Sequence, residues 1–378
     1  MTKKYPLFDI YWDEEDLEMV SRVIRRGSYW ATGPEILEFE EKLKEYFDVN
    51  YAVSFNSGTS ALHAVLLAFD ITSGEVIVPS MSFISTANCV ILANAKPVFA
   101  EIEEETLGLD LEDVKEKISK KTRAIIPMHY GGNVCKSIKE LKEVAEDNNL
   151  ILIEDNAESF GAALDDKLAG TIGDAGMLSF CQNKIITTGE GGAILTNAKD
   201  IYKKLLLIRS HGRVEQQGTN YFSNIHEMDY IQIGYNYRIP TMCAALGISQ
   251  LRKIHDIINL RRQRGKYYND LLKNLSDIQV LPEIKGIRNV FQLYSILLKT
   301  PEKRDDLQSF LLKNEIYTKV YFFPIHLKSF YKSKFGYKEG DFPKTEELSK
   351  KILTLPFSLR FTNEDQKFIT NTINSFFK

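Results

Sequence analysis

Short apolar segments alternate with amphipathic segments over the first 200 residues of the chain. The apolar segments cover residues 51–55, 75–79, 96–102, 123–128, 150–155, 177–180 and 193–196. Runs of this length and composition are typical of strands in a parallel sheet that is covered by helices on both faces. Between them, residues 36–47, 111–118 and 138–149 carry apolar side chains at helical spacing. The alternation predicts an α/β fold built on a mainly parallel sheet.

The pattern changes after about residue 250. A helix-like stretch over residues 251–275 precedes strand-like residues 291–299, helix-like residues 305–315 and a polar loop near residues 334–341. We therefore predict a large domain over residues 1–250 and a smaller C-terminal α+β domain over residues 251–378. The first 25 or so residues are a segment that can pack on the smaller domain. Basic residues on the long helix, among them Arg261, are interpreted as a solvated face.

Charge and cysteine usage exclude several classes of protein. The 48 Lys and Arg residues are balanced by 51 Asp and Glu residues, whereas a protein that holds nucleic acid needs a basic excess. No run of 18 apolar residues is present, which argues against membrane insertion. The four cysteines form no C-x-x-C pair, so we expect no metal site and reduced thiols in a cytoplasmic protein.

The turn after the first predicted strand contains the first candidate site residues. Gly58 and Thr59 lie where a strand passes into a helix, and a helix N-terminus with a glycine suits an anion. Plain helix capping by Ser57 explains the same residues. Phe83, shortly after residues 75–79, is either an aromatic ring available for stacking or a core residue.

Two further candidates carry charge. Asp155 ends a buried strand, where a carboxylate is costly unless it is paired. A metal, an arginine, a protonated ring nitrogen or loop amides would each satisfy it, and Glu158 lies three residues further on. Lys184 follows another apolar strand and precedes a glycine-rich reversal over residues 187–192. A partly desolvated lysine at that place is a nucleophile able to form a Schiff base.

The order of these elements is more specific than any one of them. An anion turn, an aromatic ring, a strand-terminal Asp155 and then Lys184 are the groups that a phosphorylated pyridine aldehyde needs. The anion turn would hold the phosphate and the aromatic ring would stack on the pyridine. The carboxylate would face the ring nitrogen and the amine would react with the aldehyde.

The sequence resembles the sugar-nucleotide aminotransferases of the DegT group, which are fold-type-I enzymes dependent on pyridoxal phosphate. The segments that carry the resemblance include NSGTSALHAVL, VIVPSMSFISTAN, ILIEDNAESFGA, LSFCQNKIITTGEGGAILTN and GYNYRIPTMCAALGISQL, and matching segments extend over nearly the whole chain. The resemblance implies a mainly parallel seven-stranded sheet with helices on both faces, a smaller C-terminal domain, and pyridoxal 5′-phosphate as cofactor.

The resemblance also implies roles for individual residues. Lys184 matches the lysine that forms the Schiff base and moves protons, and Asp155 matches the partner of the pyridinium nitrogen. Glu158 stands where the family contacts the ring hydroxyl, and Phe83 stands where an aromatic side chain stacks on the ring.

Further positions match the phosphate and substrate sites of the family. Gly58, Thr59 and Ser179 match phosphate contacts. Asn236 matches an asparagine that the neighbouring subunit donates to the phosphate, which implies a homodimer with a shared active site. His326 matches a position near the sugar, although its aromatic neighbours equally suit a packed loop.

The implied reaction is transamination of a nucleotide-linked keto sugar with L-glutamate as amino donor. The branch that makes 4-amino-4,6-dideoxy sugars, of the perosamine-synthase type, is the most similar, which implies a 4-keto-6-deoxy sugar and a product for surface polysaccharide or glycan synthesis. Two alternatives stay open. One is a deoxysugar dehydratase, a branch with His in place of Lys184; the other is a regulatory protein of the same fold without turnover.

Three residues carry weaker signals. Arg209 and His211 either contact a diphosphate or order a loop, and Asn156 stands where many relatives have alanine, so it can alter the packing under the ring. The nucleotide, the aminated carbon and the stereochemistry of the sugar are not specified by these patterns.

Overall fold

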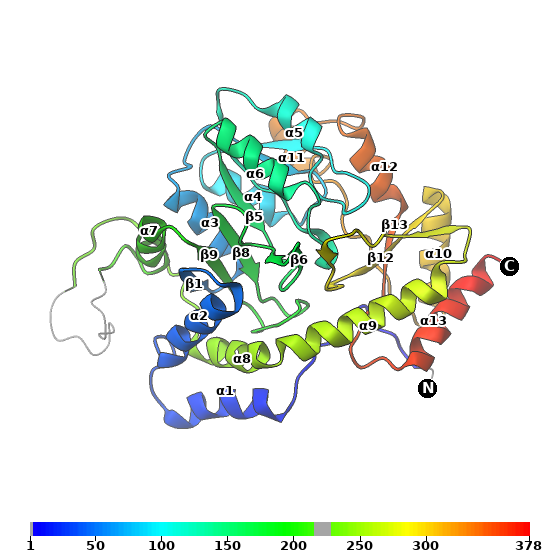
Figure 1. Ribbon diagram of the computed structural model, residues 1–378, viewed down its shortest axis with the longest axis horizontal. Helices are drawn as coiled ribbons and strands as arrows, with labels where there is room; N and C mark the ends of the chain where they lie inside the picture. The colour runs from blue at the N-terminus through cyan, green and yellow to red at the C-terminus, as the bar shows by residue number, and fades with distance from the viewer. Residues whose placement is uncertain (1–2, 215–227) are drawn as a thin grey trace.

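A seven-stranded sheet forms the centre of the computed structural model, which describes residues 3–214 and 228–378 (Figure 1). Its strands are β1 (Tyr51–Phe55), β2 (Glu75–Pro79), β3 (Lys96–Ala100), β4 (Thr122–Ile125), β5 (Ile151–Asp155), β8 (Ala175–Ser179) and β9 (Gly192–Thr196). The strand order is β1-β9-β8-β5-β4-β2-β3, and β9 alone runs antiparallel to its neighbours β1 and β8. The predicted α/β fold with a mainly parallel sheet is confirmed.

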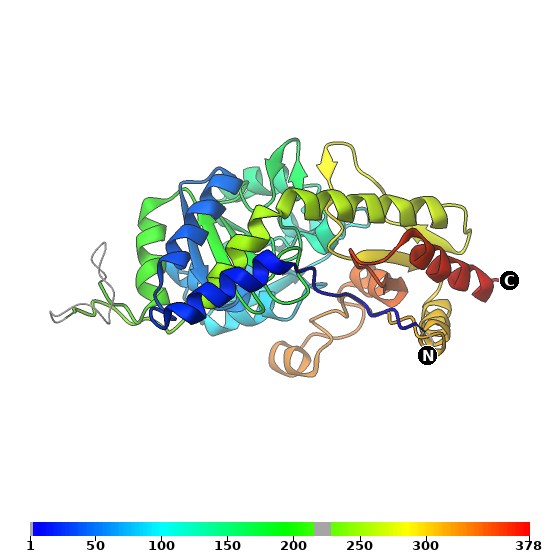
Figure 2. The ribbon, with the colours of Figure 1, turned by 90° about the horizontal axis from the view of Figure 1, so that it is seen from below.

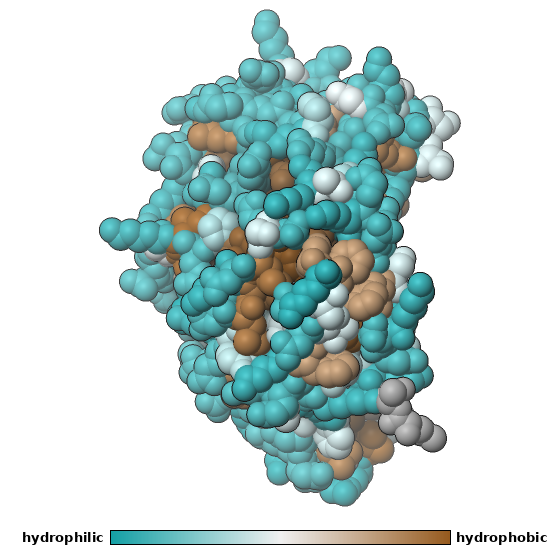
Figure 3. Space-filling view, turned by 90° about the vertical axis from the view of Figure 1, so that its right-hand side faces the viewer, coloured by the Kyte–Doolittle hydropathy of each residue, from teal (hydrophilic) through white to brown (hydrophobic). Residues whose placement is uncertain are grey.

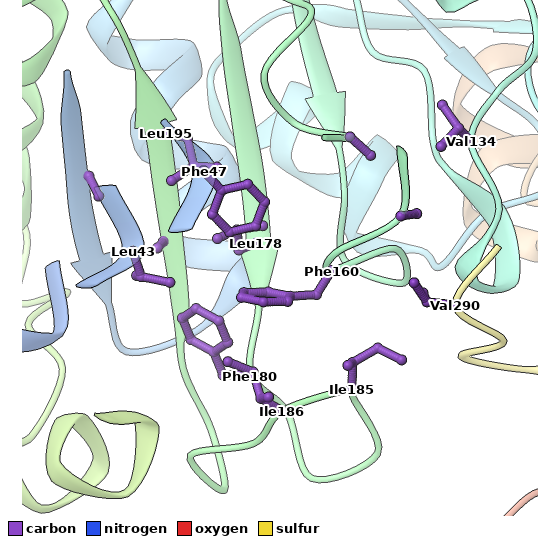
Figure 4. Packing of buried hydrophobic residues seen from close by; sticks show 14 of the residues in the cluster. Leu43, Phe47, Val134, Phe160, Leu178, Phe180, Ile185, Ile186, Leu195 and Val290 are labelled. Carbon is purple, nitrogen blue, oxygen red and sulfur yellow. The ribbon is translucent and has the colours of Figure 1, made fainter. Parts of the chain in front are cut away.

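Helices cover both faces of this sheet. On one face lie α3 (Gly58–Ala68), α4 (Ser85–Leu92) and α7 (Lys199–Arg209), which share an apolar cluster with one side of the strands. On the other lie α2 (Pro34–Phe47), α5 (Leu111–Lys117), α6 (Ile138–Asp147) and α8 (Thr241–Arg252). Figure 4 shows part of this second cluster, in which Phe47, Phe160 and Phe180 meet beside the strands. Burial on both faces explains why the strands are apolar throughout.

The C-terminal part has its own sheet and core. Its elements are α9 (Ile254–Leu272), β10 (Ile278–Val280), β11 (Ile287–Arg288), β12 (Tyr294–Leu298), α10 (Pro301–Lys313), α11 (Ser329–Phe335), α12 (Pro343–Lys351), β13 (Ile352–Leu355) and α13 (Asn363–Phe376). The sheet β10-β12-β13 is antiparallel. It packs on α9, α10 and α13 through a separate apolar cluster. The short strands β6 (Ala163–Leu164) and β7 (Lys167–Leu168) join β11 in a third sheet, and Tyr130–Gly132 form a single 3₁₀ turn.

The helix predicted over residues 251–275 is interrupted. Residues 251 and 252 end α8, and α9 begins at Ile254. Lys253 between them leaves helical geometry, with φ −96° and ψ 4°, and its Nζ lies 2.7 Å from carboxylate oxygens of both Asp13 and Asp16. The break thus lies where Lys253 contacts α1 (Glu14–Arg26) and its N-cap residue Asp13.

The N-terminal segment joins both parts of the molecule. The Tyr5 amide donates to the Glu315 carbonyl at 2.9 Å, and the Phe357 amide donates to the Leu7 carbonyl at 2.9 Å. Helix α1 lies instead on α8, where Gln250 Nε2 donates to Asp16 at 3.0 Å. Figure 2 shows the extended segment running from α1 toward the C-terminal helices. Residues 5–7 therefore contact the C-terminal part, whereas α1 contacts the larger part.

The surface at the C-terminal end is mainly hydrophilic, with an apolar area near the centre of that face (Figure 3). Within residues 3–214 and 228–378, no helix combines the length and hydropathy needed to cross a bilayer.

Candidate active site

A cavity of about 470 Å³ lies at the carboxyl ends of the parallel strands. Seven of the residues predicted from the sequence line it: Gly58, Thr59, Phe83, Asp155, Glu158, Ser179 and Lys184. Its opposite wall is the segment 319–328 that leads into α11. The location agrees with the rule that ligands bind beyond the carboxyl ends of strands in open α/β sheets.

Lys184 sits in the loop between β8 and the antiparallel β9. Its backbone amide donates to the Cys181 carbonyl at 3.0 Å, and the next two residues, Ile185 and Ile186, are buried in the core. These apolar anchors hold the loop, while the Lys184 side chain points into the cavity with 13% of its surface exposed. The glycine-rich reversal predicted after Lys184 is confirmed by the antiparallel pairing of β8 with β9.

Glu158 is the ionic partner of Lys184. The Lys184 Nζ lies 3.5 Å from Glu158 Oε1, and Glu158 Oε2 accepts a hydrogen bond from the Gly131 amide at 3.1 Å. Burial raises the pKa of the Glu158 carboxyl above its usual value, and the charge of Lys184 opposes that rise. The pair therefore places an amine and a carboxyl group side by side with little water between them.

Asp155 faces the cavity from the end of β5. Its Oδ2 accepts a hydrogen bond from Thr86 Oγ1 at 2.7 Å, and its Oδ1 accepts one from the Ala157 amide at 3.2 Å. Burial raises the pKa of this carboxyl, and the hydrogen bond from Thr86 acts in the opposite direction. Across the described ranges, no cationic side chain forms an ion pair with Asp155. A buried carboxyl group without such a partner suits a cationic ligand group in the cavity.

Glu154 precedes Asp155 and points to the other side of the strand, as strand geometry requires. Its oxygens accept hydrogen bonds from the amides of Gly170, Ile172 and Gly173 at 2.6–2.8 Å and from His129 Nε2 at 2.8 Å. Glu154 is thus fully satisfied within the protein and orders the loop beneath β5. Glu154 therefore binds within the protein, whereas Asp155 faces the cavity.

The turn after β1 forms an anion cradle. Ser57 Oγ accepts the Ser60 amide at 3.0 Å and caps α3, so the predicted cap is present. The amides of Gly58 and Thr59 lie at the N-terminus of the same helix, beside Ser179. A Cβ at position 58 would lie only 3.0 Å from the Ser179 Cβ. Glycine therefore permits the close approach of helix and strand that leaves room for a phosphate.

Phe83 is a cavity residue and not a core residue. Its side chain is 57% exposed, and its ring centroid lies 6.3 Å from that of Phe322 on the opposite wall. A large apolar side chain that lines a cavity with so much exposed surface offers a face on which a flat ring can stack. A phosphorylated pyridine aldehyde fits this set of groups, which comprises the turn at Gly58, the buried Asp155, the exposed ring of Phe83 and Lys184.

Asn236 and His326 do not line this cavity. Asn236 is exposed on the surface, where its carbonyl accepts a hydrogen bond from Asn56 Nδ2 at 3.3 Å. His326 is fully buried, and its ring nitrogens are 2.5 Å from Ser80 Oγ and 3.1 Å from Glu346 Oε1. Both of its nitrogens are already bonded within the protein, which favours the packed loop over the sugar contact for His326.

Two arginines are buried, whereas the sequence suggested a ligand-binding or loop role for Arg209 and a solvated face for Arg261. Arg209 is buried and pairs with Glu40, and it donates to the Ser54 carbonyl at 3.0 Å, so it orders the structure below the cavity. Arg261 is 9% exposed and donates to two backbone carbonyls; the solvated face predicted for it is wrong. Asn156 lies away from the cavity, where its Nδ2 donates to the Ala169 carbonyl at 2.8 Å.

Sequence reasoning missed one residue behind the cavity and two that line it. Thr86, the donor to Asp155, has no signal beyond its place after Phe83. Lys319 and Lys328 line the far wall, and their Nζ atoms lie 5.0 Å and 4.9 Å from the ring centroids of Tyr321 and Phe323. A signal for these lysines exists, because they bracket the aromatic run YFFP.

A family profile described as the DegT/DnrJ/EryC1/StrS aminotransferase family matches residues 11–374. The chain belongs to this family. The DegT family assignment makes it a pyridoxal-phosphate-dependent aminotransferase, and the cavity residues described above fit that cofactor. Lys184, Asp155 and Gly58 line one cavity, where they could supply an amine, a carboxylate and a phosphate cradle.

Individual members of the DegT family align over the whole length of the chain. The GDP-perosamine synthase of Escherichia coli O157:H7 is 34% identical over 99% of this chain and 99% of its own. The UDP-4-amino-4,6-dideoxy-N-acetyl-beta-L-altrosamine transaminase of Campylobacter jejuni is 31% identical over 96% and 95%. The solved structure of PseC from Helicobacter pylori, an aminotransferase involved in the biosynthesis of pseudoaminic acid, superimposes with a TM-score of 0.91 at 27% identity over 99% of both chains.

Proposed function

We propose that this enzyme transfers the amino group of L-glutamate to a nucleotide-linked 4-keto-6-deoxy sugar. The observation that carries the proposal is the cavity itself, in which the Lys184–Glu158 pair and the buried Asp155 face two lysines on the opposite wall. The names of relatives, which include GDP- and UDP-linked amino sugars, support the substrate class. The product would be an amino sugar for surface polysaccharide or glycan synthesis.

The residues of the chain divide the chemistry among them. When bound, pyridoxal phosphate withdraws electrons from the carbon atom that carries the amino group. Asp155 would hold the proton on the ring nitrogen, and Phe83 would fix the plane of the ring. Gly58, Thr59 and Ser179 would bind the phosphate through the helix N-terminus.

Lys184 would hold the cofactor between turnovers and carry protons during each half of the reaction. Its amine lies beside Glu158, whose pKa is raised by burial. The Glu158 carboxyl group can balance the charge of the Lys184 amine. It can also form a hydrogen bond with the ring hydroxyl of the cofactor. Burial of the pair keeps water from competing for the transferred proton.

Lys319 and Lys328 support a nucleotide-linked substrate. Both are exposed at the cavity wall, and both have their ammonium groups over aromatic rings. Two cations on one cavity wall suit a diphosphate, and the half-exposed ring of Phe323 on the same wall suits a nucleobase or sugar face. The keto sugar would then extend from the diphosphate toward Lys184.

The homodimer belongs to the same proposal. Asn236 is exposed and does not line the cavity of its own chain, and neighbouring apolar residues such as Ile231 and Ile233 are exposed by 59% and 88%. A second copy that covers these residues would bring Asn236 to the phosphate cradle of its partner. All four cysteines are unpaired, as expected of an enzyme working in the reducing cytoplasm.

The first test is the visible absorption spectrum of the protein with pyridoxal phosphate, before and after addition of L-glutamate. We expect a visible band that disappears with glutamate and that never forms in Lys184→Ala. Candidate keto sugars linked to GDP, UDP or dTDP should then restore the band and gain an amino group, as measured by mass spectrometry. A band that glutamate leaves unchanged would contradict the donor, and a dehydrated product would favour the dehydratase alternative. Absence of any band would favour a regulatory protein without turnover.

A further inference from the structure

One short segment of the C-terminal part contacts the lysine loop directly. Gln292, which lies between β11 and β12, is 4% exposed, and its Nε2 donates a hydrogen bond to the carbonyl of Asn183. Asn183 immediately precedes Lys184. The side chain of Gln292 thus bonds to the backbone immediately before Lys184.

The same segment also supports the carboxylate that pairs with Lys184. The Leu293 amide donates to the Gly131 carbonyl at 3.0 Å. The Gly131 amide in turn donates to Glu158 Oε2 at 3.1 Å, and Glu158 Oε1 lies 3.5 Å from the Lys184 Nζ. Residues 290–293 therefore contact the supports of both members of the Lys184–Glu158 pair.

Helix α9 holds this segment in place. Arg261 Nε and one terminal nitrogen donate to the carbonyls of Phe291 and Gln292, both at 2.9 Å. The guanidinium carbon lies 4.9 Å from the ring centroid of Phe357. A planar group that bonds to two successive carbonyls fixes both the position and the direction of the segment. Gly265, one turn further along α9, has no side chain to displace the Phe291 ring, which a Cβ there would approach to 2.5 Å.

Apolar packing joins the segment to the lysine loop as well. Val290, Ile185 and Ile186 are buried in the same cluster, and Figure 4 shows Val290 opposite Ile185. The loop is therefore held on the C-terminal side of Lys184 by buried apolar residues and on its N-terminal side by the hydrogen bond from Gln292.

We propose that Gln292 is a positioning residue for Lys184, and that Arg261 holds Gln292 in the orientation this requires. The inference rests on the proposed function for its kinetic consequences only. Loss of one hydrogen bond would change the stability of the fold little, because its net contribution is small. It would change the rate far more, because proton transfer depends on where the amine lies.

The test compares Gln292→Met with a matched control, Gln366→Met. Both glutamines are buried, both donate through Nε2 to a backbone carbonyl, and both have an Oε1 without a hydrogen-bond partner among the described residues. Gln366 bonds to the Arg264 carbonyl in α9 and does not line the cavity. Gln292→Asn is the second variant, because it keeps an amide but is one methylene too short to reach Asn183.

Two readouts are needed. In the enzyme loaded with pyridoxal phosphate, Gln292→Met should lower kcat with glutamate about 10- to 100-fold and leave KM within about twofold. In the protein without cofactor, amide hydrogen exchange over residues 183–187 should become faster. Gln366→Met should change neither quantity, and Gln292→Asn should behave as Gln292→Met does.

The outcomes separate the inference from the function on which it rests. A Gln292→Met enzyme with wild-type kcat, or with exchange over residues 183–187 no faster than in Gln366→Met, overturns the positioning role while wild-type turnover stands. If Gln292→Met does not fold, Gln292→Asn decides by the same two readouts. If the wild type fails to react with any amino donor, the proposed function falls, and the exchange comparison alone decides whether Gln292 fixes the loop.

Discussion

Replacing Thr86 by valine should weaken the hold of the enzyme on pyridoxal phosphate without unfolding the protein. Thr86 is fully buried at the start of α4, and its Oγ1 donates to Asp155 Oδ2 at 2.7 Å. Valine has nearly the same shape, so the change removes a hydroxyl and leaves the packing almost intact. Ser82 Oγ, 2.7 Å from the Thr86 hydroxyl, loses a partner but stays beside the cavity.

The magnitude follows from the charge of the acceptor. A hydrogen bond to a charged group contributes about 1.5–3 kcal/mol, and about 1.4 kcal/mol corresponds to a factor of ten in affinity. Burial already raises the pKa of Asp155, and the bond from Thr86 opposes that rise. Without it, the pKa rises further, the carboxylate is harder to keep ionised, and cofactor affinity should fall about 10- to 100-fold.

The assay is a titration of the protein without cofactor, followed by the visible absorbance. Thr370→Val is the matched control, since it removes a buried hydroxyl that donates to the Gln366 carbonyl at 2.9 Å in α13, away from the cavity. We expect the control to bind as the wild type does. A dissociation constant for Thr86→Val within about threefold of wild type would refute the view that Thr86 keeps Asp155 ionised.

Three further predictions concern the cradle, the framework and pH. In the same titration, Gly58→Val should weaken the binding of pyridoxal phosphate about tenfold, because the added Cβ lies 3.0 Å from the Ser179 Cβ. The binding of pyridoxal, which has no phosphate, should weaken less. Equal losses for the two ligands would contradict a phosphate-binding role. Arg209→Met leaves Glu40 buried without its ion pair, so urea unfolding should show a loss of about 3–5 kcal/mol with kcat per folded enzyme unchanged. Burial raises the pKa of Glu158 above its ordinary 4.5, so its contribution to stability is complete at low pH and is lost as pH rises through the elevated pKa. Melting temperatures of the cofactor-free protein above pH 4.5 should therefore fall less steeply with pH in Glu158→Gln than in the wild type, and parallel curves would contradict the shift.

Local sequence patterns were sufficient to predict the strands of the central sheet. Strands buried on both faces must be apolar throughout, and this is why the segments that became β1, β2 and β5 could be located to within a residue or two. The break at Lys253 was not located, and the partners of Lys253, Asp13 and Asp16, lie more than 230 residues away in the sequence. No local signal marks a contact between such distant segments.

The cavity was predictable for a related reason. Parallel strands bring their carboxyl ends to one edge, so residues such as Asp155 and Lys184 meet there whatever the loops between them do. The role of His326 stayed open and that of Arg261 was misjudged, because a sequence does not show whether a polar side chain finds its partners inside the protein. In each case buried partners, Glu346 for His326 and backbone carbonyls for Arg261, decide the outcome.

The N-terminal segment has a consequence for the order in which the protein can be completed on the ribosome. Tyr5 and Leu7 bond to the backbone of Glu315 and Phe357, which are synthesised more than 300 residues later. The central sheet can pair while translation continues, since its strands are all made before residue 200. Tyr5 and Leu7 must wait for these partners until Glu315 and Phe357 have emerged. Residues 5–7 are therefore made before the central sheet but form these hydrogen bonds only after it is complete.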